Sequence, residues 1–249
     1  MRLSVITVSY NSASTIADTL RSVAEQSHPD IEHLVIDGSS SDSTLQIVGA
    51  HGAHVTRLIS EPDKGIYEAM NKGLALATGD YVGFLNADDL FATSQAVAQL
   101  ARAATSGADA VFGDLVYVAA REVHQVVRRW QSGEFRASQL RFGWMPPHPT
   151  FYVKRSLLPA LGGFDTSLRI AADYDFMLRC LARSGARACY APHVLVRMRL
   201  GGASNESFHA LWRKSREDLL VMRRHGLPGW LALAGKNIRK VPQFLSAKR

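Results

Sequence analysis

The sequence contains few of the features that mark secreted or membrane-spanning proteins. Only two of its 249 residues are cysteines, Cys180 and Cys189, which excludes a disulfide scaffold and fits a reducing cytoplasm. It has no uncharged apolar run of about 18 residues or more, so we expect no transmembrane helix. The first residues lack the apolar core and cleavage site of a signal peptide. We therefore expect a cytoplasmic protein.

Glycine-rich phosphate-binding motifs are missing as well. The sequence contains neither Gly-x-x-x-x-Gly-Lys-Ser/Thr nor Gly-x-Gly-x-x-Gly. Without the second motif, a dinucleotide-dependent oxidoreductase is disfavoured. If the protein binds a diphosphate, a metal ion would have to take the place of the glycine loop.

The positive charge is concentrated at the C-terminal end. The chain has 29 basic and 22 acidic residues, a net charge of +7. Residues 205–249 hold ten of the basic and three of the acidic residues, whereas residues 1–204 hold nineteen of each. We therefore expect a domain of residues 1–204 followed by a basic helical tail of residues 205–249, a size that suits one large α/β domain with an appendage.

Strand and helix patterns alternate through residue 112. Short apolar runs predict strands at residues 3–8, 33–36, 56–60, 81–85 and 110–112. Helical spacing of apolar residues predicts helices at 14–27, 66–77 and 94–104, with a short helix ending near residue 48. This alternation is typical of a doubly wound, mainly parallel α/β sheet.

The most informative stretch is residues 79–89, in which a buried strand ends in Asn86, Asp88 and Asp89. Ligands bind at the carboxyl edge of such sheets. Adjacent carboxylates repel each other unless a cation or a ring of donors lies between them, and Mg²⁺ or Mn²⁺ takes oxygen ligands of this kind. The alternative is that one aspartate only caps the next helix.

Two other strands also end in a loop with an acid, Asp37 and Asp63. Right-handed crossovers would bring these loops to the same edge of the sheet as Asp88 and Asp89. Three acidic loops at successive strand ends suggest a site for a nucleotide base, a ribose and a metal-bound diphosphate.

Beyond residue 113 the alternation weakens. Residues 116–118 and 122–129 resemble the arms of an antiparallel hairpin, and the aromatic, proline-rich segment 142–151 is expected to be an exposed loop that forms a lid or an acceptor-binding wall, or else a packed Ω-loop. Asp173 begins a helix that ends near residue 182. It could cap that helix, or the helix N-terminus could keep it ionised as a general base.

Five segments in this order resemble glycosyltransferase family 2, the nucleotide-sugar-dependent enzymes with the GT-A fold. They are residues 5–11 (VITVSYN), 37–44 (DGSSSDST), 63–71 (DKGIYEAMN), 85–89 (LNADD) and 172–175 (ADYD). The likeness covers roughly residues 2–205. Together with residues 148–152 (HPTFY), these segments look most like the branch that assembles bacterial surface polysaccharides and glycolipids.

The resemblance implies a role for each matching residue. The donor nucleotide would be bound by Ser9, Tyr10, Asp37, Asp63, Asn86 and Asp88. A Mg²⁺ or Mn²⁺ cofactor would be held by Asp89 together with Asp88, and Asp173 would be the catalytic base. On the acceptor side we expect His148 and Trp144. Residues 1–112 would then form the nucleotide-sugar-binding half and 113–204 the acceptor-side half.

Three departures from the family pattern qualify this prediction. Asn86 stands where many relatives have a third acid, and Ala172 precedes the base where Glu is common. The processive signature Gln/Arg-x-x-Arg-Trp is absent, since Val126 occupies its first position. We therefore expect inverting transfer of one sugar per encounter to a lipid-linked saccharide or glycolipid. A catalytically inactive nucleotide-sugar-binding scaffold is the alternative.

The tail has a pattern typical of a helix that lies on an anionic membrane. Apolar residues recur at helical spacing at Trp230, Leu233, Ala234, Ile238, Val241 and Leu245, with Lys236, Arg239 and Lys240 among them. This predicts peripheral association with the inner face of the cytoplasmic membrane. Packing of the apolar stripe on the domain is the alternative. Nucleic-acid binding is disfavoured because the segment has no known reader motif.

Overall fold

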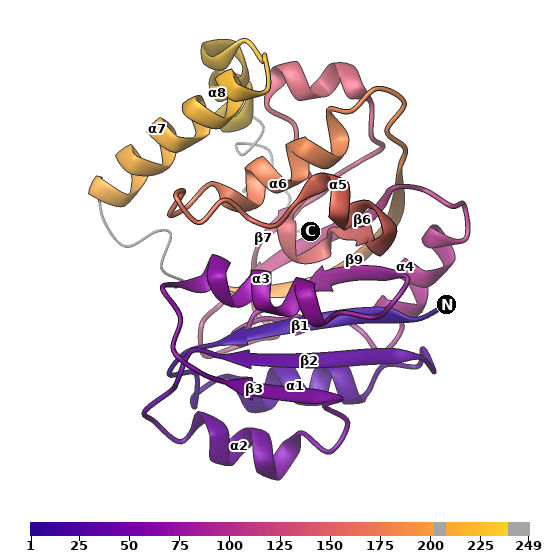
Figure 1. The fold of residues 1–249 in the computed structure, drawn as a ribbon, viewed down its shortest axis with the longest axis vertical. Helices are drawn as coiled ribbons and strands as arrows, with labels where there is room; N and C mark the ends of the chain where they lie inside the picture. Colours follow the sequence, from indigo (N-terminus) through magenta and orange to yellow (C-terminus); the bar gives the residue numbers. More distant parts are fainter. Residues whose placement is uncertain (202–207, 239–249) are drawn as a thin grey trace.

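The computed structural model describes residues 1–201 and 208–238, which form a central sheet with helices on both faces (Figure 1). The strands are β1 (Leu3–Ser9), β2 (Ile31–Asp37), β3 (Arg57–Ser60), β4 (Tyr81–Phe84), β5 (Leu90–Phe91), β6 (Ala110–Val118), β7 (Val126–Trp130), β8 (Tyr152–Lys154) and β9 (Ala188–Arg199). The helices are α1 (Ile16–Ala24), α2 (Thr44–His51), α3 (Ile66–Leu76), α4 (Ala96–Ala104), α5 (Leu158–Leu161), α6 (Ala172–Leu181), α7 (Phe208–Arg224) and α8 (Gly229–Ile238). Three short 3₁₀ helices are η1 (Ala137–Phe142), η2 (His148–Thr150) and η3 (Arg155–Leu157).

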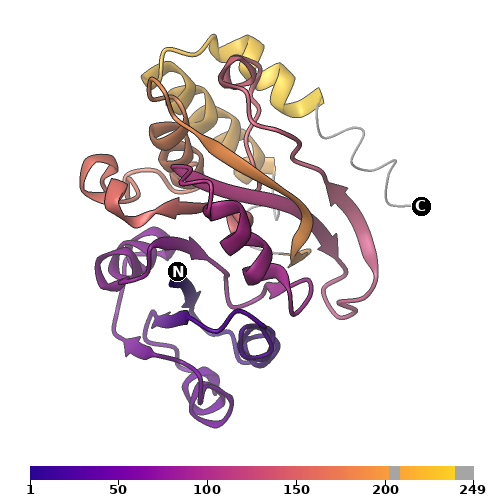
Figure 2. The same cartoon turned by 90° about the vertical axis from the view of Figure 1, so that its right-hand side faces the viewer.

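The first half of the sheet is parallel, and its strands β1, β2 and β4 are buried on both faces, whereas the edge strand β3 is largely exposed. Within the described chain the strand order is β3-β2-β1-β4-β8-β6-β9-β5, and β7 pairs with β6. Strand β1 lies parallel to both β2 and β4, so Ile6 is level with Leu34 on one side and Phe84 on the other. Helix α3 packs on one face of these strands and α1 on the other (Figure 2). Burial on both faces explains why these strands are apolar runs.

The predicted fold class is confirmed: a doubly wound, mainly parallel sheet with a smaller mixed part. The predicted hairpin is also present, because β6 and β7 are antiparallel. Its first arm and the strand predicted at residues 110–112 are one continuous strand, β6. The boundary that we placed between residues 112 and 113 therefore falls inside a strand that the two halves share.

The second half of the sheet contains an antiparallel insertion that we did not predict. The short strand β8 lies between β4 and β6 and is antiparallel to both. Strand β9, for which we predicted no element, pairs in parallel with β6. Strands β4 and β6 run in the same direction, and the strand between them, β8, follows both of them in the sequence.

The prediction that residues 142–151 form an exposed loop is wrong for most of the segment, which is buried from residue 146 to 151. Three of the residues between 146 and 149 are prolines, which have no N–H group that would need a partner in the interior. Trp144 is also buried, and its indole N–H donates to the Ser132 carbonyl at 3.0 Å. Thr150 Oγ1 is hydrogen-bonded to the Gly113 carbonyl at 3.1 Å. These bonds allow a polar backbone to be buried as a packed loop.

Helices α7 and α8 pack against the rest of the fold. Three of their side chains are fully buried in the main core: Val221, Met222 and Ala232. Gly143 and Gly235 lie at the contact between η1 and α8, where an added Cβ would meet a backbone oxygen of Ala232 or Phe142. Among the helices that the structure describes, none is both long and apolar enough to cross a bilayer.

The apolar stripe that we predicted for membrane contact is divided where the structure describes it, because Leu233 lies inward while Trp230 and Ala234 are exposed. Leu233 packs against the core, and Lys236 forms a buried ion pair with Asp218 at 2.8 Å. Trp230, in contrast, is 72% exposed. Leu233 and Lys236 thus pack on the domain, whereas Trp230 remains available to an outside surface. Residues 239–245 of the predicted stripe lie outside the described residues.

Candidate functional site

Asp37, the last residue of β2, is completely buried and held by serines. It accepts hydrogen bonds from Ser9 Oγ at 3.0 Å, Ser60 Oγ at 2.8 Å, Ser40 N at 2.9 Å and Ser40 Oγ at 2.5 Å. Burial alone would raise the pKa of Asp37, but the hydrogen bonds from Ser40, Ser60 and Ser9 lower it below its ordinary value. The carboxylate is therefore ionised and fixed in place.

Next to Asp37, two loops are fastened to each other. Asn11 N donates to Ser40 Oγ at 2.8 Å, and Ser41 N donates to Asn11 Oδ1 at 2.9 Å. Among the described non-glycine residues, only Asn11 and Ser39 have positive φ, 48° and 61°. Such conformations often store strain at functional sites. Tyr10, which is 64% exposed, directly precedes Asn11, so its backbone adjoins a fixed loop.

Asp63 lies against the backbone of the Asp37 loop. A Cβ added to Gly38 would be 2.6 Å from Asp63 Oδ2, so only glycine permits this approach. Asp63 Oδ1 also accepts a hydrogen bond from Gly65 N at 2.8 Å. The structure thus brings the acidic loops after β2 and β3 together.

Asp88 and Asp89 follow β4 at the same edge of the sheet. The loop that carries them is tied to β1 because Ala87 N donates to the Val8 carbonyl at 3.2 Å. Asp89 is completely buried, and among the described residues its Oδ1 accepts a single hydrogen bond, from Arg199 N at 3.2 Å. Burial, and then the negative charge of Asp88, hold the pKa of Asp89 well above its ordinary range. Burial likewise raises the pKa of Asp88.

Several buried polar atoms at this place have no hydrogen-bond partner among the described residues. They are Asn86 Oδ1, Asp89 Oδ2, His148 Nε2 and Arg199 Nε. Buried polar groups in native proteins are nearly always paired, so such a cluster indicates a ligand. Of these atoms, the carboxylate oxygen of Asp89 is of the kind that a hard divalent cation prefers.

The protein itself could supply only part of a metal coordination shell. Among the described residues, no group of three or more His, Cys, Asp or Glu side chains is arranged to hold a metal ion. Asp88 and Asp89 would therefore be completed by substrate phosphates and water, as is common for Mg²⁺. The residues present fit a cation that binds together with a diphosphate.

Arg199, at the end of β9, is a site residue that the sequence did not reveal. It is buried, its Nη1 donates to the Asp88 carbonyl at 3.0 Å, and its Nη2 forms an ion pair with Asp18 at 2.5 Å. The only signal in the sequence is a charged residue at the end of a strand-like apolar run. Its contact with Asp88 depends on the pairing of β9, which we did not predict.

Asp173 lies one position inside the N-terminus of α6. The N-cap residue is Ala171, which makes no side-chain cap, and Asp173 Oδ1 accepts a hydrogen bond from the next backbone N–H, that of Tyr174, at 2.8 Å. The carboxylate is half-buried. Asp173 is therefore not the N-cap of this helix, although it binds one N–H group of the first turn.

Tyr117 on β6 lies within electrostatic range of two of the candidate acids, Asp89 and Asp173. Burial is the main cause of its raised pKa, Arg128 lowers the pKa, and the negative charges of Asp89 and Asp173 raise it further. Both carboxylates thus lie within electrostatic range of one phenol. The guanidinium of Arg128 stacks on the same ring, 4.6 Å from its centroid. Sequence reasoning missed both Tyr117 and Arg128, which belong to no recognisable motif.

The two acceptor-side predictions have different surroundings. His148 is stacked on Phe84 with ring centroids 5.4 Å apart, and although burial lowers the pKa of His148, the charge of Asp173 opposes this shift. His148 therefore lies near Asp173. Trp144 packs edge-on against Phe112 in the core, and its indole N–H already has a partner.

The segment that leads into α6 is held by helix α7. The carboxylate of Glu217 accepts hydrogen bonds from three consecutive backbone N–H groups, those of Arg169 at 3.2 Å, Ile170 at 2.8 Å and Ala171 at 3.0 Å. Tyr67 on α3 donates to the Ile170 carbonyl at 2.7 Å. Asp173 is thus positioned by groups from both ends of the chain.

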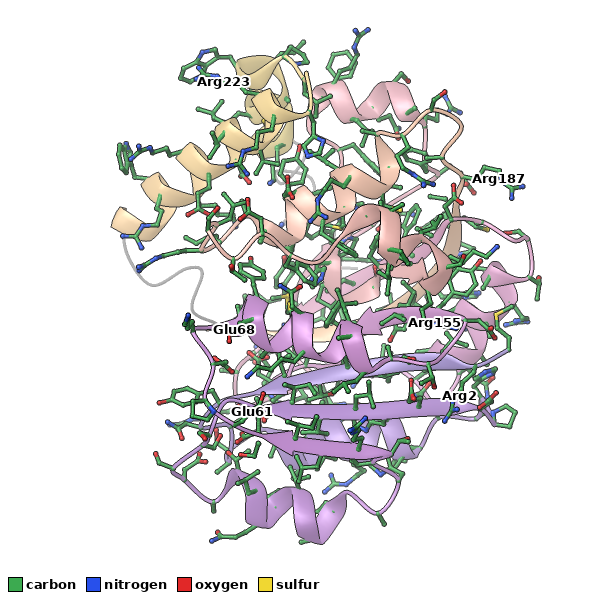
Figure 3. The ribbon with its side chains drawn as sticks, in the orientation of Figure 1. Arg2, Glu61, Glu68, Arg155, Arg187 and Arg223 are labelled. Carbon is green, nitrogen blue, oxygen red and sulfur yellow. The ribbon has the colours of Figure 1, made fainter. Side chains whose placement is uncertain are left out.

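The carboxyl ends of β1, β2 and β3 all point to one side of the molecule. In Figure 3 this edge is marked by Glu61, after β3, and Glu68, in the first turn of α3, whereas Arg2 marks the opposite edge (Figure 3). Ser9, Asp37 and Asp63 therefore share one rim with the Asp88–Asp89 loop.

Comparisons with known proteins agree with this arrangement. The family described as Glycosyl transferase family 2 matches residues 4–170. A PGL/p-HBAD biosynthesis glycosyltransferase of Mycobacterium bovis (strain BCG / Pasteur 1173P2) is 32% identical over 209 residues, which cover 81% of this chain and 78% of that protein. A putative teichuronic acid biosynthesis glycosyltransferase, TuaG of Bacillus subtilis (strain 168), is 42% identical over 92 residues, 35% of this chain and 36% of that protein.

Solved structures show the same fold at lower sequence identity. S. aureus TarS 1-349 in complex with UDP-GlcNAc has a TM-score of 0.71 and 22% identity, with 99% of this chain and 72% of that chain covered. The mannosyltransferase PcManGT of Pyrobaculum calidifontis in complex with GDP-Man and Mn²⁺ has a TM-score of 0.66 and 21% identity, with 99% of this chain and 73% of that chain covered. The fold is thus GT-A, and the chain belongs to glycosyl transferase family 2, so it is a glycosyltransferase.

Proposed function

We propose that this enzyme transfers one sugar, with inversion, from a nucleotide-diphosphate sugar to a hydroxyl group of a lipid-linked saccharide or glycolipid, and that it needs Mg²⁺ or Mn²⁺. The observation that carries the proposal is that Asp89, whose Oδ2 has no partner among the described residues, and Asp173 both lie within electrostatic range of Tyr117. Asp89 is suited to binding a cation, and Asp173 is suited to accepting a proton.

The donor would lie along the rim from Asp63 to Asp89. Tyr10 would pack on the nucleotide base and Asp37 would accept a hydrogen bond from it, while Ser9 keeps Asp37 in place. Asn86 and Asp88 would lie at the ribose and diphosphate. The metal ion, held by Asp89 and Asp88, would stabilise the charge that grows on the leaving phosphate.

Asp173 would act as the general base. Its carboxylate accepts the proton of the acceptor hydroxyl while that oxygen bonds to the anomeric carbon of the sugar. The bond from the anomeric carbon to the diphosphate breaks on the opposite face, so the configuration inverts. His148 lies near Asp173 with an unpaired Nε2, which could hydrogen-bond the acceptor. The core position of Trp144 gives an acceptor contact by this residue less support.

The names of the relatives support the acceptor class. They are a PGL/p-HBAD biosynthesis glycosyltransferase and a putative teichuronic acid biosynthesis glycosyltransferase, which suggests a role in the biosynthesis of cell-surface polysaccharide or glycolipid. Such an acceptor would place the enzyme at the cytoplasmic face of the membrane as a peripheral protein. The alternative of an inactive scaffold is weakened because Asp37, Asp88, Asp89 and Asp173 are all present.

The test is the release of nucleoside diphosphate from a panel of UDP- and GDP-sugars, with Mn²⁺ and a bacterial lipid-linked saccharide extract as acceptor. We expect Asp173→Asn to lower turnover about 10²–10⁴-fold and to leave donor affinity unchanged. Asp80→Asn, an exposed acid at the amino end of β4, is the matched control. Near-normal turnover by Asp173→Asn would disprove the base assignment, and a wild-type protein that binds a donor without consuming it would favour the scaffold.

A further inference from the structure

We propose that the outer face of α7 and α8 docks on a membrane surface that contains anionic lipids. We define this outer face by six residues: Trp212, Arg216, Leu220 and Arg223 of α7, and Trp230 and Leu231 of α8. The inference rests on the peripheral location proposed above and identifies the surface that would make the contact. This outer face shares only Trp230 with the stripe that the sequence pattern indicated.

The α7 residues form one stripe along the helix. Positions 212, 216, 220 and 223 are spaced by four, four and three residues, which places them on the same side. Trp212 is 62% exposed and Leu220 is 43% exposed. The opposite side of α7 carries Asp218, Val221 and Met222, which are all buried. The stripe therefore points away from the domain.

The first turn of α8 extends this stripe. A Cβ added to Gly229 would lie 3.3 Å from Leu219 Cδ2 and 3.9 Å from Arg223 Cγ, so α8 begins beside the C-terminal end of the stripe. Trp230 and Leu231 follow directly and are 72% and 51% exposed. Figure 3 marks Arg223 at the outer end of the α7–α8 pair.

The acidic residues of α7 do not neutralise the outer face. Glu217 is used by the three backbone N–H groups before α6, and Asp218 by Lys236. Neither Arg216 nor Arg223 forms an ion pair with another residue in the described part of the chain, and Arg216 stacks on Trp212 at 5.7 Å. The outer face thus combines apolar rings with uncompensated positive charge.

This combination matches the interface of an anionic bilayer. Tryptophan is enriched at the headgroup level because its ring is apolar and its N–H is polar. Arginine is attracted to the negative surface potential, and its apolar stem can follow the indole into the headgroups. Two exposed tryptophans are otherwise costly on a protein surface. Anionic lipid is therefore the occupant that accounts for both the rings and the charges.

Co-sedimentation of the full-length protein with vesicles tests this proposal. We expect the wild type to bind vesicles of equal parts phosphatidylcholine and phosphatidylglycerol, and to bind phosphatidylcholine alone much more weakly. The double variants Arg216→Glu/Arg223→Glu and Trp212→Ala/Trp230→Ala should each bind the mixed vesicles at least about tenfold more weakly than the wild type does. Arg57→Glu/Leu58→Ala on β3, which also changes an exposed arginine and an exposed leucine, is the control and should bind as the wild type does.

Wild-type binding by the Arg216→Glu/Arg223→Glu variant would overturn the proposal, and so would a wild type that ignores the mixed vesicles. If the wild type instead forms dimers that Trp212→Ala/Trp230→Ala cannot form, the face is a contact between two copies and the proposal is wrong. Thermal stabilisation by UDP or GDP with Mn²⁺, measured on each variant, should stay unchanged. A failure of docking is thereby distinguished from a failure of donor binding.

Discussion

Asp37 and Asp89 are both completely buried acids that follow parallel strands on either side of β1, but their surroundings are opposite. Three serines direct four hydrogen bonds to Asp37. Asp89 accepts one backbone hydrogen bond, and its second oxygen has no partner among the described residues. The first carboxylate is stabilised by the protein, whereas the second needs a cation from outside.

This difference indicates how the site is assembled. The end of the site that we assign to the nucleotide base is preformed, because Asp37 is ionised there and the surrounding loops are hydrogen-bonded to each other. The end that we assign to the diphosphate is incomplete until a cation and its phosphates arrive. We therefore expect the two acids to respond in opposite ways when they are replaced.

The largest effect on stability should come from Asp37→Ala. Its loss leaves the donors of buried Ser9, half-buried Ser40 and exposed Ser60 without their acceptor, and hydrogen bonds to charged groups contribute about 1.5–3 kcal/mol each. We expect the free energy of unfolding to fall by about 3 kcal/mol or more in urea denaturation without metal. Asp89→Asn should be neutral or stabilising under the same conditions, because it removes a buried carboxylate that, among the described residues, accepts a single hydrogen bond from Arg199 N. If both variants lose stability equally, Asp37 and Asp89 do not differ in how the protein stabilises them.

Glu217→Gln should have the next largest effect, because it replaces the carboxylate that binds the N–H groups of residues 169–171. We expect a loss of about 2 kcal/mol in unfolding free energy. Since Asp173 follows this segment, turnover should also fall by about tenfold, with donor affinity unchanged. Glu134→Gln, at an exposed position, is the control. A variant that loses stability but keeps full turnover would show that Glu217 does not position Asp173.

The smallest effect concerns His33, on the same strand as Asp37. Burial, and then the neighbouring His54, lower the pKa of His33 to about 3. The unfolded state therefore takes up a proton below pH ~6.5 that the folded state excludes, so stability is full above that pH and declines as the pH falls toward 3. At pH 5.5 this histidine alone should cost about 1.4 kcal/mol. Urea denaturation at pH 7.5 and 5.5 measures it, and His33→Asn should flatten the difference.

The first half of the fold could be predicted because strands that are buried on both faces are apolar runs. Their abrupt ends at Asp37 and Asp88–Asp89 also revealed one rim of the site. The second half could not be predicted in the same way. Strand β8 has only three residues, and β9 contains Pro192 and shifts its register against β6, so neither has a regular pattern.

The residues that sequence reasoning missed depend on these irregular strands. Arg199 reaches Asp88 only because β9 pairs with β6 and β5. Likewise, the inward direction of Lys236 is set by its partner Asp218 on another helix. A helical period shows which residues share a face, but it does not show which way that face points.

A cation at Asp89 is the feature on which the proposed reaction depends most directly. The decisive measurement is the melting temperature of the wild type and Asp89→Asn with UDP or GDP, each with and without Mn²⁺. For the wild type, nucleotide and Mn²⁺ together should stabilise far more than either alone, by about 2.7 kcal/mol at a hundredfold excess over the dissociation constant. Asp89→Asn should lose this joint increment. Full joint stabilisation of Asp89→Asn, or nucleotide binding by the wild type that is indifferent to Mn²⁺, would contradict the account.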